Sequence, residues 1–310
     1  MENTRAKTTR NSLILLLTAT IWGMAFVSQS KGMDYMHPFT FNGVRSLIGA
    51  AGILVYILIS RKIAGDKAAK LDWKLNVRAG LLCGIFLTIA STLQQFGIKY
   101  TSVGKAGFIT TLYIIFVPMF GVFLKKKVAP VVWAAAGMAA VGMYLLCMTE
   151  SLRLGAGDIM VFLCAIAFAI QIMTVDHYAA RIDGAVVSCI QFTVCGVVCC
   201  IGALIWGQPT FGQIQEGLGA LLYAGVLSCG VGYTLQIVGQ KGLNPTVAAL
   251  IMSLESVIAT ISGWIAYKIG FLSTDQTLTP RQIAGCIIVF AAVILVQLPP
   301  EWFRFGKKND

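Results

Sequence analysis

Two ionisable side chains, Arg45 and Glu255, stand in the middle of long apolar stretches of this chain. A charge at the centre of a membrane-spanning helix costs about 2.5–3.5 kcal/mol on insertion scales, so such residues usually face the protein interior and have a partner. Three interpretations stay open. Glu255 could take up and release a proton, because burial favours the uncharged carboxyl. The two residues could instead pair as a structural bridge. Alternatively, either could bind a charged substrate group, and the planar guanidinium of Arg45 suits a carboxylate.

Further polar and aromatic side chains lie within apolar stretches and are expected to line a cavity together with Arg45 and Glu255. They are Trp22, Gln94, Thr110, Tyr113, Tyr233, Gln236 and Ser253. Gln94 and Gln236 need hydrogen-bond partners when they are buried. They could act as equivalent gates on opposite faces, or they could only link neighbouring helices. Trp22 is too deep for the interfacial aromatic belt, so it either packs or borders the cavity.

The residues do not favour enzyme chemistry. The sequence contains neither a Walker A loop nor an HExxH motif, and it has only 13 Asp and Glu residues. Its 9 cysteines all fall inside apolar stretches, where a free thiol behaves as a small hydrophobe. We therefore expect no catalytic residues, no cofactor, no metal site and no disulfide framework.

The composition requires membrane-spanning elements to position these residues. The 310 residues are 57% hydrophobic and 12% charged, with a mean hydropathy of +0.79. About 20 apolar residues in a helix cross the hydrocarbon layer, and the sequence predicts ten such helices. They are Ser12–Gln29, Pro38–Ser60, Ala79–Ile98, Ala106–Leu124, Val128–Met148, Ile159–Val175, Ala185–Trp206, Gly217–Gln240, Gly242–Tyr267 and Gln282–Gln297.

The basic residues predict the orientation. Cytoplasmic connections are rich in Lys and Arg. With the N-terminus inside, 17 of these residues lie on the cytoplasmic side and 6 on the other. Both termini are therefore predicted to be cytoplasmic. The net charge of +11 is explained by this anchoring, so no nucleic-acid partner is expected. The first apolar stretch resembles a signal peptide but lacks a convincing cleavage site, so it is interpreted as an uncleaved helix.

The chain also repeats itself. Thr92–Lys99 matches Thr234–Lys241 at an offset of 142, with five of eight positions identical, and the same register sets Tyr113 over Glu255. A weaker register at an offset of 146 sets Arg45 over Gln191. The predicted halves are residues 1–149 and 150–310. Each half has five crossings, an odd number, so the second half enters the membrane from the opposite side. Inverted repeats of this kind are common in secondary transporters.

At this level the chain resembles the drug/metabolite transporter superfamily, specifically its bacterial EamA-type members. The similarity covers nearly the whole chain, and it is carried by Ile21–Val27, Arg45, Tyr100–Ser102, Ala106–Tyr113, Ala248–Val257 and Thr279–Gln282. The resemblance implies ten helices and a central cavity lined mainly by the third, fourth, eighth and ninth. It also implies export or exchange of metabolites such as amino acids.

The function predicted from the sequence is alternating-access transport of small organic metabolites across the bacterial inner membrane. The expected partners are the substrate and the lipid bilayer, and a homodimer is left open. Two alternatives are weaker. An intramembrane enzyme would need a cluster of polar residues at one face. A channel or regulatory membrane protein fits poorly with an inverted repeat. The chain contains no ATP-binding module, so a gradient must drive transport. The substrate, the direction and the coupling ion stay open.

Overall fold

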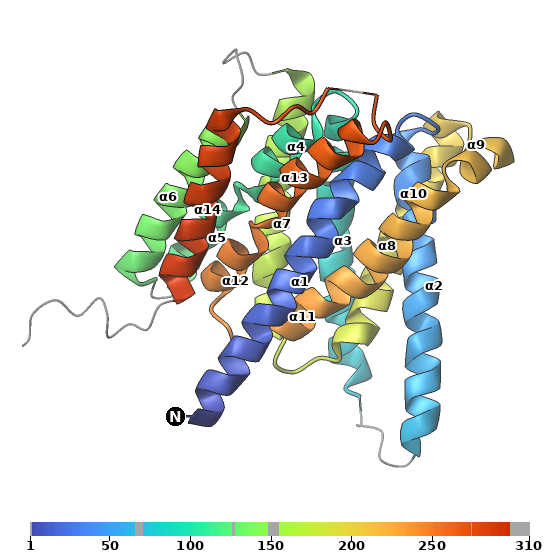
Figure 1. Cartoon of the computed structure of the whole chain (residues 1–310). Helices are drawn as coiled ribbons and strands as arrows, with labels where there is room; N and C mark the ends of the chain where they lie inside the picture. Colours follow the sequence, from blue (N-terminus) through green and yellow to red (C-terminus); the bar gives the residue numbers. More distant parts are fainter. Residues whose placement is uncertain (1, 66–70, 126–127, 148–154, 274, 298–310) are drawn as a thin grey trace, which may run out of the picture.

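The computed structural model describes residues 2–65, 71–125, 128–147, 155–273 and 275–297. These residues form helices and connecting turns, with no strand in the described ranges (Figure 1). The α-helices and two π-helical segments (η) are α1 Glu2–Gly32, α2 Pro38–Ala64, α3 Trp73–Ile98, α4 Val103–Thr111, α5 Tyr113–Phe123, α6 Pro130–Cys147, α7 Ala156–Tyr178, α8 Gly184–Gly202, η2 Ala203–Gly207, α9 Phe211–Glu216, α10 Leu218–Leu222, η3 Tyr223–Gly232, α11 Tyr233–Gln240, α12 Pro245–Met252, α13 Glu255–Lys268 and α14 Pro280–Gln297.

Local sequence fixes where several helices begin. Asp72 accepts a hydrogen bond from the backbone N–H of Leu75 at the start of α3, and Asn244 accepts one from Thr246 at the start of α12. Such caps satisfy backbone donors that have no partner within the helix. Proline occupies the first position of α2 and of α12, where its missing N–H costs nothing.

The described part of the chain contains eight helices that are long and apolar enough to cross a membrane. Two shorter apolar helices, Pro130–Gly142 and Pro280–Leu295, lie within α6 and α14. The protein is therefore an all-α, multi-pass membrane protein. Each of the ten stretches predicted from the sequence lies mostly on helical structure. Met148, the last residue of the fifth stretch, and the predicted boundary at 149/150 lie outside the described residues.

Four of the ten stretches are not regular α-helix throughout. The fourth is divided at Leu112 into α4 and α5, and the ninth at Ser253 and Leu254 into α12 and α13. At both breaks the backbone tightens, because the N–H of Leu112 bonds to Ile109 and that of Leu254 bonds to Ile251. The seventh stretch ends in η2, and the eighth contains η3. Hydropathy could not predict these changes, since all the residues involved are compatible with helix.

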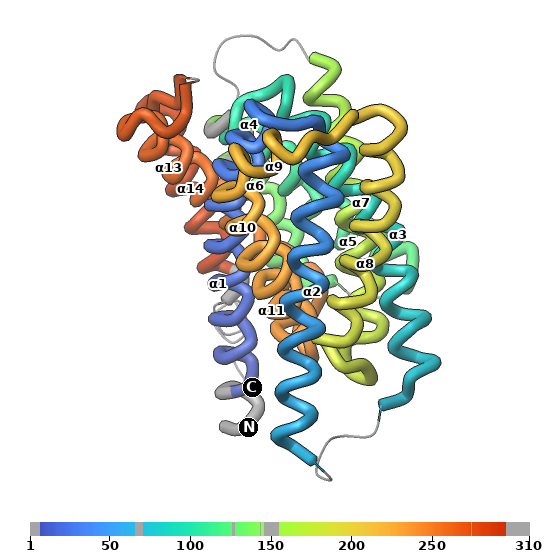
Figure 2. Tube along the Cα trace, turned by 90° about the vertical axis from the view of Figure 1, so that its right-hand side faces the viewer, coloured from blue at the N-terminus to red at the C-terminus, as the bar shows by residue number. Residues whose placement is uncertain are grey.

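The helices pack in a small number of close pairs. α2 packs against α8, and α6 packs against α14 at the edge of the bundle (Figure 1). α3 packs against α7 and α8, while α1 packs against α13 and α11. Figure 2 shows the same bundle from the side, with α2 running along α8. α14 ends at the end of the bundle where α1 begins (Figure 1). We call this the N-terminal end and the other the opposite end.

Candidate functional site

A small cavity of about 30 Å³ lies in the centre of the bundle. That volume accommodates one or two water molecules, so the side chains around it leave little free space. Its walls come from α1, α2, α3, α4, α5, α7, α8, η3, α11 and α13. Helices from both predicted halves therefore contribute to one central space.

Eight of the nine residues predicted to line a cavity border this space. They are Trp22, Arg45, Gln94, Thr110, Tyr113, Tyr233, Gln236 and Glu255. The described lining does not include Ser253. Its hydroxyl turns back within the helix and donates to the carbonyl oxygen of Leu250 at 2.7 Å. A serine in a helix often bonds in this way to the preceding turn, so Ser253 contributes to the break between α12 and α13 instead.

Tyr113 and Glu255 meet directly at the cavity wall. The Tyr113 hydroxyl donates to Glu255 Oε1 at 2.9 Å, and both side chains are buried. Each residue is the first residue after a helix break, Tyr113 in α5 and Glu255 in α13. Discontinuous helices near the midplane are typical of transporter binding sites. The hydrogen bond therefore joins the two broken helices at the cavity.

Arg45 is the most unusual polar group in the cavity. It is only 5% exposed, and its guanidinium lies 5.3 Å from the ring centre of Phe41. Its Nε has no hydrogen-bond partner among the described residues, and no ion pair joins Arg45 to Glu255 there. The structure thus does not support a bridge between the two. A buried guanidinium with unused donors is suited to an anionic group such as a carboxylate.

The two glutamines of the sequence repeat each bond to a neighbouring helix. Gln94 Nε2 donates to the Thr110 hydroxyl at 3.1 Å. Gln236 Nε2 donates to Gln171 Oε1, also at 3.1 Å. These bonds link helices, as the simpler of the two interpretations requires. Both pairs also border the cavity.

Aromatic side chains form another part of the wall. The rings of Trp22 and Tyr233 are 4.5 Å apart, and Tyr233 lies 5.0 Å from Phe192 in an edge-to-face contact. Trp22 Nε1 is buried and has no partner among the described residues. Aromatic pairs of this kind add about 0.5–1.5 kcal/mol beyond their burial. This part of the wall is thus held by packing between aromatic rings, and the Trp22 N–H is a hydrogen-bond donor without a partner among the described residues.

Sequence reasoning missed several polar residues of the lining. They are Gln29, Ser46, Ser91, Gln171 and Ser228. Gln94 was identified as an amide side chain within an apolar stretch. Gln29 and Gln171 meet the same criterion and could have been predicted in the same way. The serines could not, because small hydroxyl residues are common wherever membrane helices pack closely. No group of three or more potential metal ligands occurs among the described residues.

A glycine contact closes the bundle beyond each end of the cavity. Gly97, near the end of α3, packs so closely on α7 that an added methyl group would overlap Val161. Gly239, near the end of α11, packs so closely on α1 that an added methyl group would overlap Leu15. The first contact lies one turn beyond Gln94 and the second one turn beyond Gln236. Neighbouring helices therefore touch at both of these places, with no space for an added methyl group.

Polar contacts reinforce both closures. At the opposite end, Lys105 Nζ lies 2.6 Å from Asp158 Oδ2, and the Thr101 hydroxyl donates to Asp158 Oδ1 at 3.1 Å. This ion pair ties α4 to α7. At the N-terminal end, Asn11 Nδ2 donates to the carbonyl oxygen of Lys241 at 2.8 Å, which ties α1 to the end of α11. Each end of the bundle thus has a polar contact between helices near its glycine contact.

Comparison with known proteins agrees with this architecture. The EamA-like transporter family model matches residues 10–148 and 155–298. The chain is 28% identical to an uncharacterized transporter of Archaeoglobus fulgidus over 92% of this chain and 84% of that protein. It is 24% identical to the uncharacterized transporter YwfM of Bacillus subtilis over 94% of each. One solved crystal structure shares the fold, with a TM-score of 0.73, 16% identity and coverage of 96% and 99%.

An all-helical membrane bundle, together with these relatives, points to a membrane transporter. The chain belongs to the EamA-like transporter family and thus to the drug/metabolite transporter superfamily. Its partners are accordingly the lipid bilayer and a small-molecule substrate.

Proposed function

We propose that the chain is a secondary transporter of the bacterial inner membrane that exports or exchanges small organic metabolites by alternating access. The observation that carries the proposal is the small central cavity, which has a separate set of interhelical contacts beyond each end. Opening one set while the other stays closed would expose the cavity to one side of the membrane at a time. A channel would need both sets open together.

The proposal includes two inverted five-helix repeats, residues 1–149 and 150–310. The glycine contacts support this repeat. Gly239 is the counterpart of Gly97 at the sequence offset of 142, and Val161 is the counterpart of Leu15 at the offset of 146. The contact of Gly97 with Val161 therefore has the contact of Gly239 with Leu15 as its counterpart. Two equivalent closures at opposite ends are what an inverted repeat provides for alternating access.

The proposed topology has ten crossings, with α6 and α14 as the fifth and tenth. These two helices are apolar and pack against each other, and equivalent helices meet in this way around a two-fold axis. An even number of crossings leaves both termini on one side, which fits the position of the end of α14 (Figure 1). The excess of Lys and Arg places that side in the cytoplasm.

The charged groups of the cavity narrow the substrate class. Arg45 offers unused donors for an anionic group, while Glu255 lies on another wall with its second carboxylate oxygen available. A zwitterion such as an amino acid presents a carboxylate and an ammonium to such a pair. Because the cavity now has a volume of only about 30 Å³, it must expand when the substrate enters, and binding and opening are therefore coupled.

Transport into proteoliposomes tests the proposal. Each compound in a panel of amino acids and related metabolites is tested in turn. Its labelled form is added outside vesicles that contain the unlabelled form, and uptake of the label is measured. A carrier is expected to give saturable uptake that increases several-fold when the compound is present inside. Uptake that does not saturate and does not respond to internal compound would favour the channel. Glu255→Gln, measured with and without a pH gradient, separates exchange from proton-driven movement.

A further inference from the structure

A second recess lies at the N-terminal end of the bundle, separate from the central cavity. It has a volume of about 250 Å³ and is bordered by α1, by the connection from α7 to α8, and by α11. Three cationic residues line it, namely Lys7 and Arg10 from α1 and Lys241 at the end of α11. Residues more than 230 positions apart in the chain thus bring their positive charges to one hollow.

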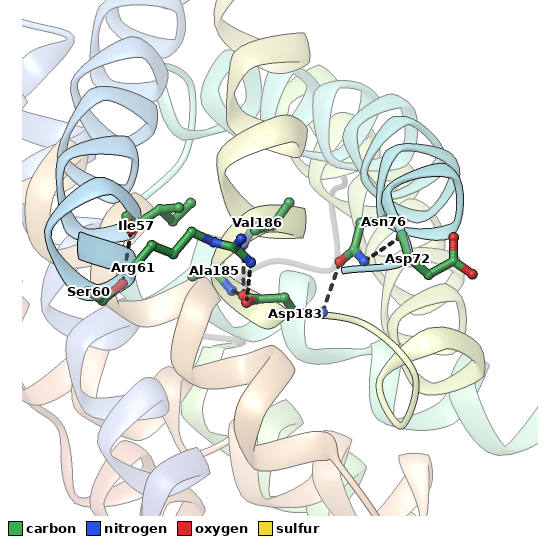
Figure 3. A network of polar contacts seen from close by, with 8 residues as sticks. All are labelled: Ile57, Ser60, Arg61, Asp72, Asn76, Asp183, Ala185 and Val186. Atoms are coloured by element: carbon green, nitrogen blue, oxygen red, sulfur yellow. Dashed lines mark hydrogen bonds and ion pairs between the residues drawn. The ribbon is translucent and has the colours of Figure 1, made fainter. Parts of the chain in front are cut away.

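The positive charge of the recess is not neutralised within the described protein. No acidic residue occurs among its described lining, and none of the three cations forms an ion pair with a described acid. The neighbouring acid, Asp183, is engaged elsewhere. Its carboxylate accepts hydrogen bonds from the N–H groups of Ala185 and Val186 and lies 4.0 Å from Arg61 (Figure 3). The recess is therefore complementary to an anion.

The surface next to the cations is apolar. Leu13 and Leu17 follow Arg10 on the same face of α1, at spacings of three and seven residues, and are 60% and 51% exposed. On α11, Val238 lies one turn before Lys241 and is 40% exposed. Residues at these spacings share one side of a helix. Arg10 and Lys241 thus each stand at the head of an apolar strip that runs into the membrane.

We propose that this recess binds the phosphate of an anionic phospholipid, with an acyl chain lying along Leu13 and Leu17. A free phosphate would use the three cations but would leave the apolar strips without a role. The site lies beside the bond from Asn11 to the carbonyl oxygen of Lys241. A bound lipid therefore clamps α1 to α11, which stabilises the closure at this end. The inference does not depend on the identity of the transported substrate.

Native mass spectrometry of the purified protein tests the site. The protein is titrated with phosphatidylglycerol and, separately, with phosphatidylcholine of the same chain length, and the first bound lipid is counted. Each neutralised cation is expected to weaken phosphatidylglycerol binding about fivefold, since a basic residue near an anionic surface contributes about 1 kcal/mol. The double variant Arg10→Gln with Lys241→Gln should therefore lose about 25-fold, whereas phosphatidylcholine binding should not change.

The control variant carries Lys62→Gln and Lys74→Gln, which removes the same charge from exposed positions outside the recess. It should bind phosphatidylglycerol as the wild type does. The charge-preserving Lys241→Arg should also bind normally, which separates loss of charge from damage to the fold. Equal weakening in the control would overturn the proposal in favour of diffuse attraction. Displacement of the lipid by soluble glycerol phosphate at comparable concentrations would overturn the assignment to a lipid.

Discussion

Tyr113 and Glu255, which occupy the same position in the two copies of the sequence repeat, hydrogen bond to each other across the central cavity at 2.9 Å. Residues related by a two-fold axis come this close only when both lie near that axis. Each also stands directly after a break in its helix. In the proposed inverted repeat, the contact therefore lies where the two halves meet.

Loss of this bond is expected to weaken the fold. Tyr113→Phe leaves a buried carboxyl oxygen without its donor, which should lower the free energy of unfolding by about 1–3 kcal/mol. Thermal unfolding in detergent measures the change. Tyr233→Phe is the matched control, because that tyrosine borders the same cavity and has no hydrogen bond from its hydroxyl to a described residue. Equal losses in both variants would show that the bond to Glu255 has no special weight.

Arg45 should reveal a trade-off between stability and function. A buried charge without a partner destabilises the protein, and replacing it with an apolar residue of similar length often stabilises it. We expect Arg45→Met to unfold at a higher temperature than the wild type while losing transport. Arg45→Lys should keep part of the activity, because it retains the charge but not the planar fork. A fall in both stability and transport in Arg45→Met would instead indicate a structural role.

The glycine contacts should control which side of the membrane reaches the cavity. Gly97→Ala forces α3 away from Val161, and Gly239→Ala forces α11 away from Leu15. Overpacking of this kind costs about 1–3 kcal/mol, enough to shift a conformational equilibrium about fivefold or more. In a chain whose 9 native cysteines have been replaced, labelling of a cysteine introduced at Ser228 by a membrane-impermeant maleimide reports access from each side.

The two variants are expected to act in opposite directions. Gly97→Ala should speed labelling from the external side, and Gly239→Ala should speed it from the cytoplasmic side. Gly52→Ala serves as the control, because no atom lies within 4 Å of the added methyl group. If both glycine variants change access from the same side, the two contacts do not form separate gates.

The buried glutamines allow a simpler comparison. Gln94→Ala and Gln236→Ala each remove one interhelical hydrogen bond. We expect each to reduce the transport rate while the amount of folded protein in the membrane stays near that of the wild type. Transport assays normalised to protein amount make the comparison. A loss of expression with unchanged specific activity would assign these residues to helix packing alone.

The positions of the membrane helices could be predicted because length and hydropathy decide them directly. The positions of Arg45, Gln94 and Glu255 around one cavity could also be anticipated, since polar groups in apolar stretches turn towards the protein interior. The sequence also aligned Tyr113 with Glu255, although it did not indicate that the two would touch. That contact depends on how close each lies to the axis, which is set by packing of the whole bundle.

Other features had no usable signal in the sequence. The breaks at Leu112 and at Ser253 involve ordinary helix-compatible residues, and the π-helical turns of η3 contain no proline. Such irregularities arise from packing against neighbouring helices. The cationic recess could not be predicted from the sequence either. Lys7 and Arg10 lie far from Lys241 in the chain, and the general excess of Lys and Arg on the cytoplasmic side already explains each of these residues.

The most direct test of alternating access measures both ends of the bundle in one experiment. In a chain whose 9 cysteines have been replaced, pairs of spin labels at Tyr100 and Ala156 report the opposite end, and pairs at Lys7 and Asn244 report the N-terminal end. Distances are recorded in lipid bilayers for the wild type, Gly97→Ala and Gly239→Ala. Alternating access predicts that whenever one pair moves apart the other stays close. Populations in which both pairs are separated at once would contradict the account and identify a channel.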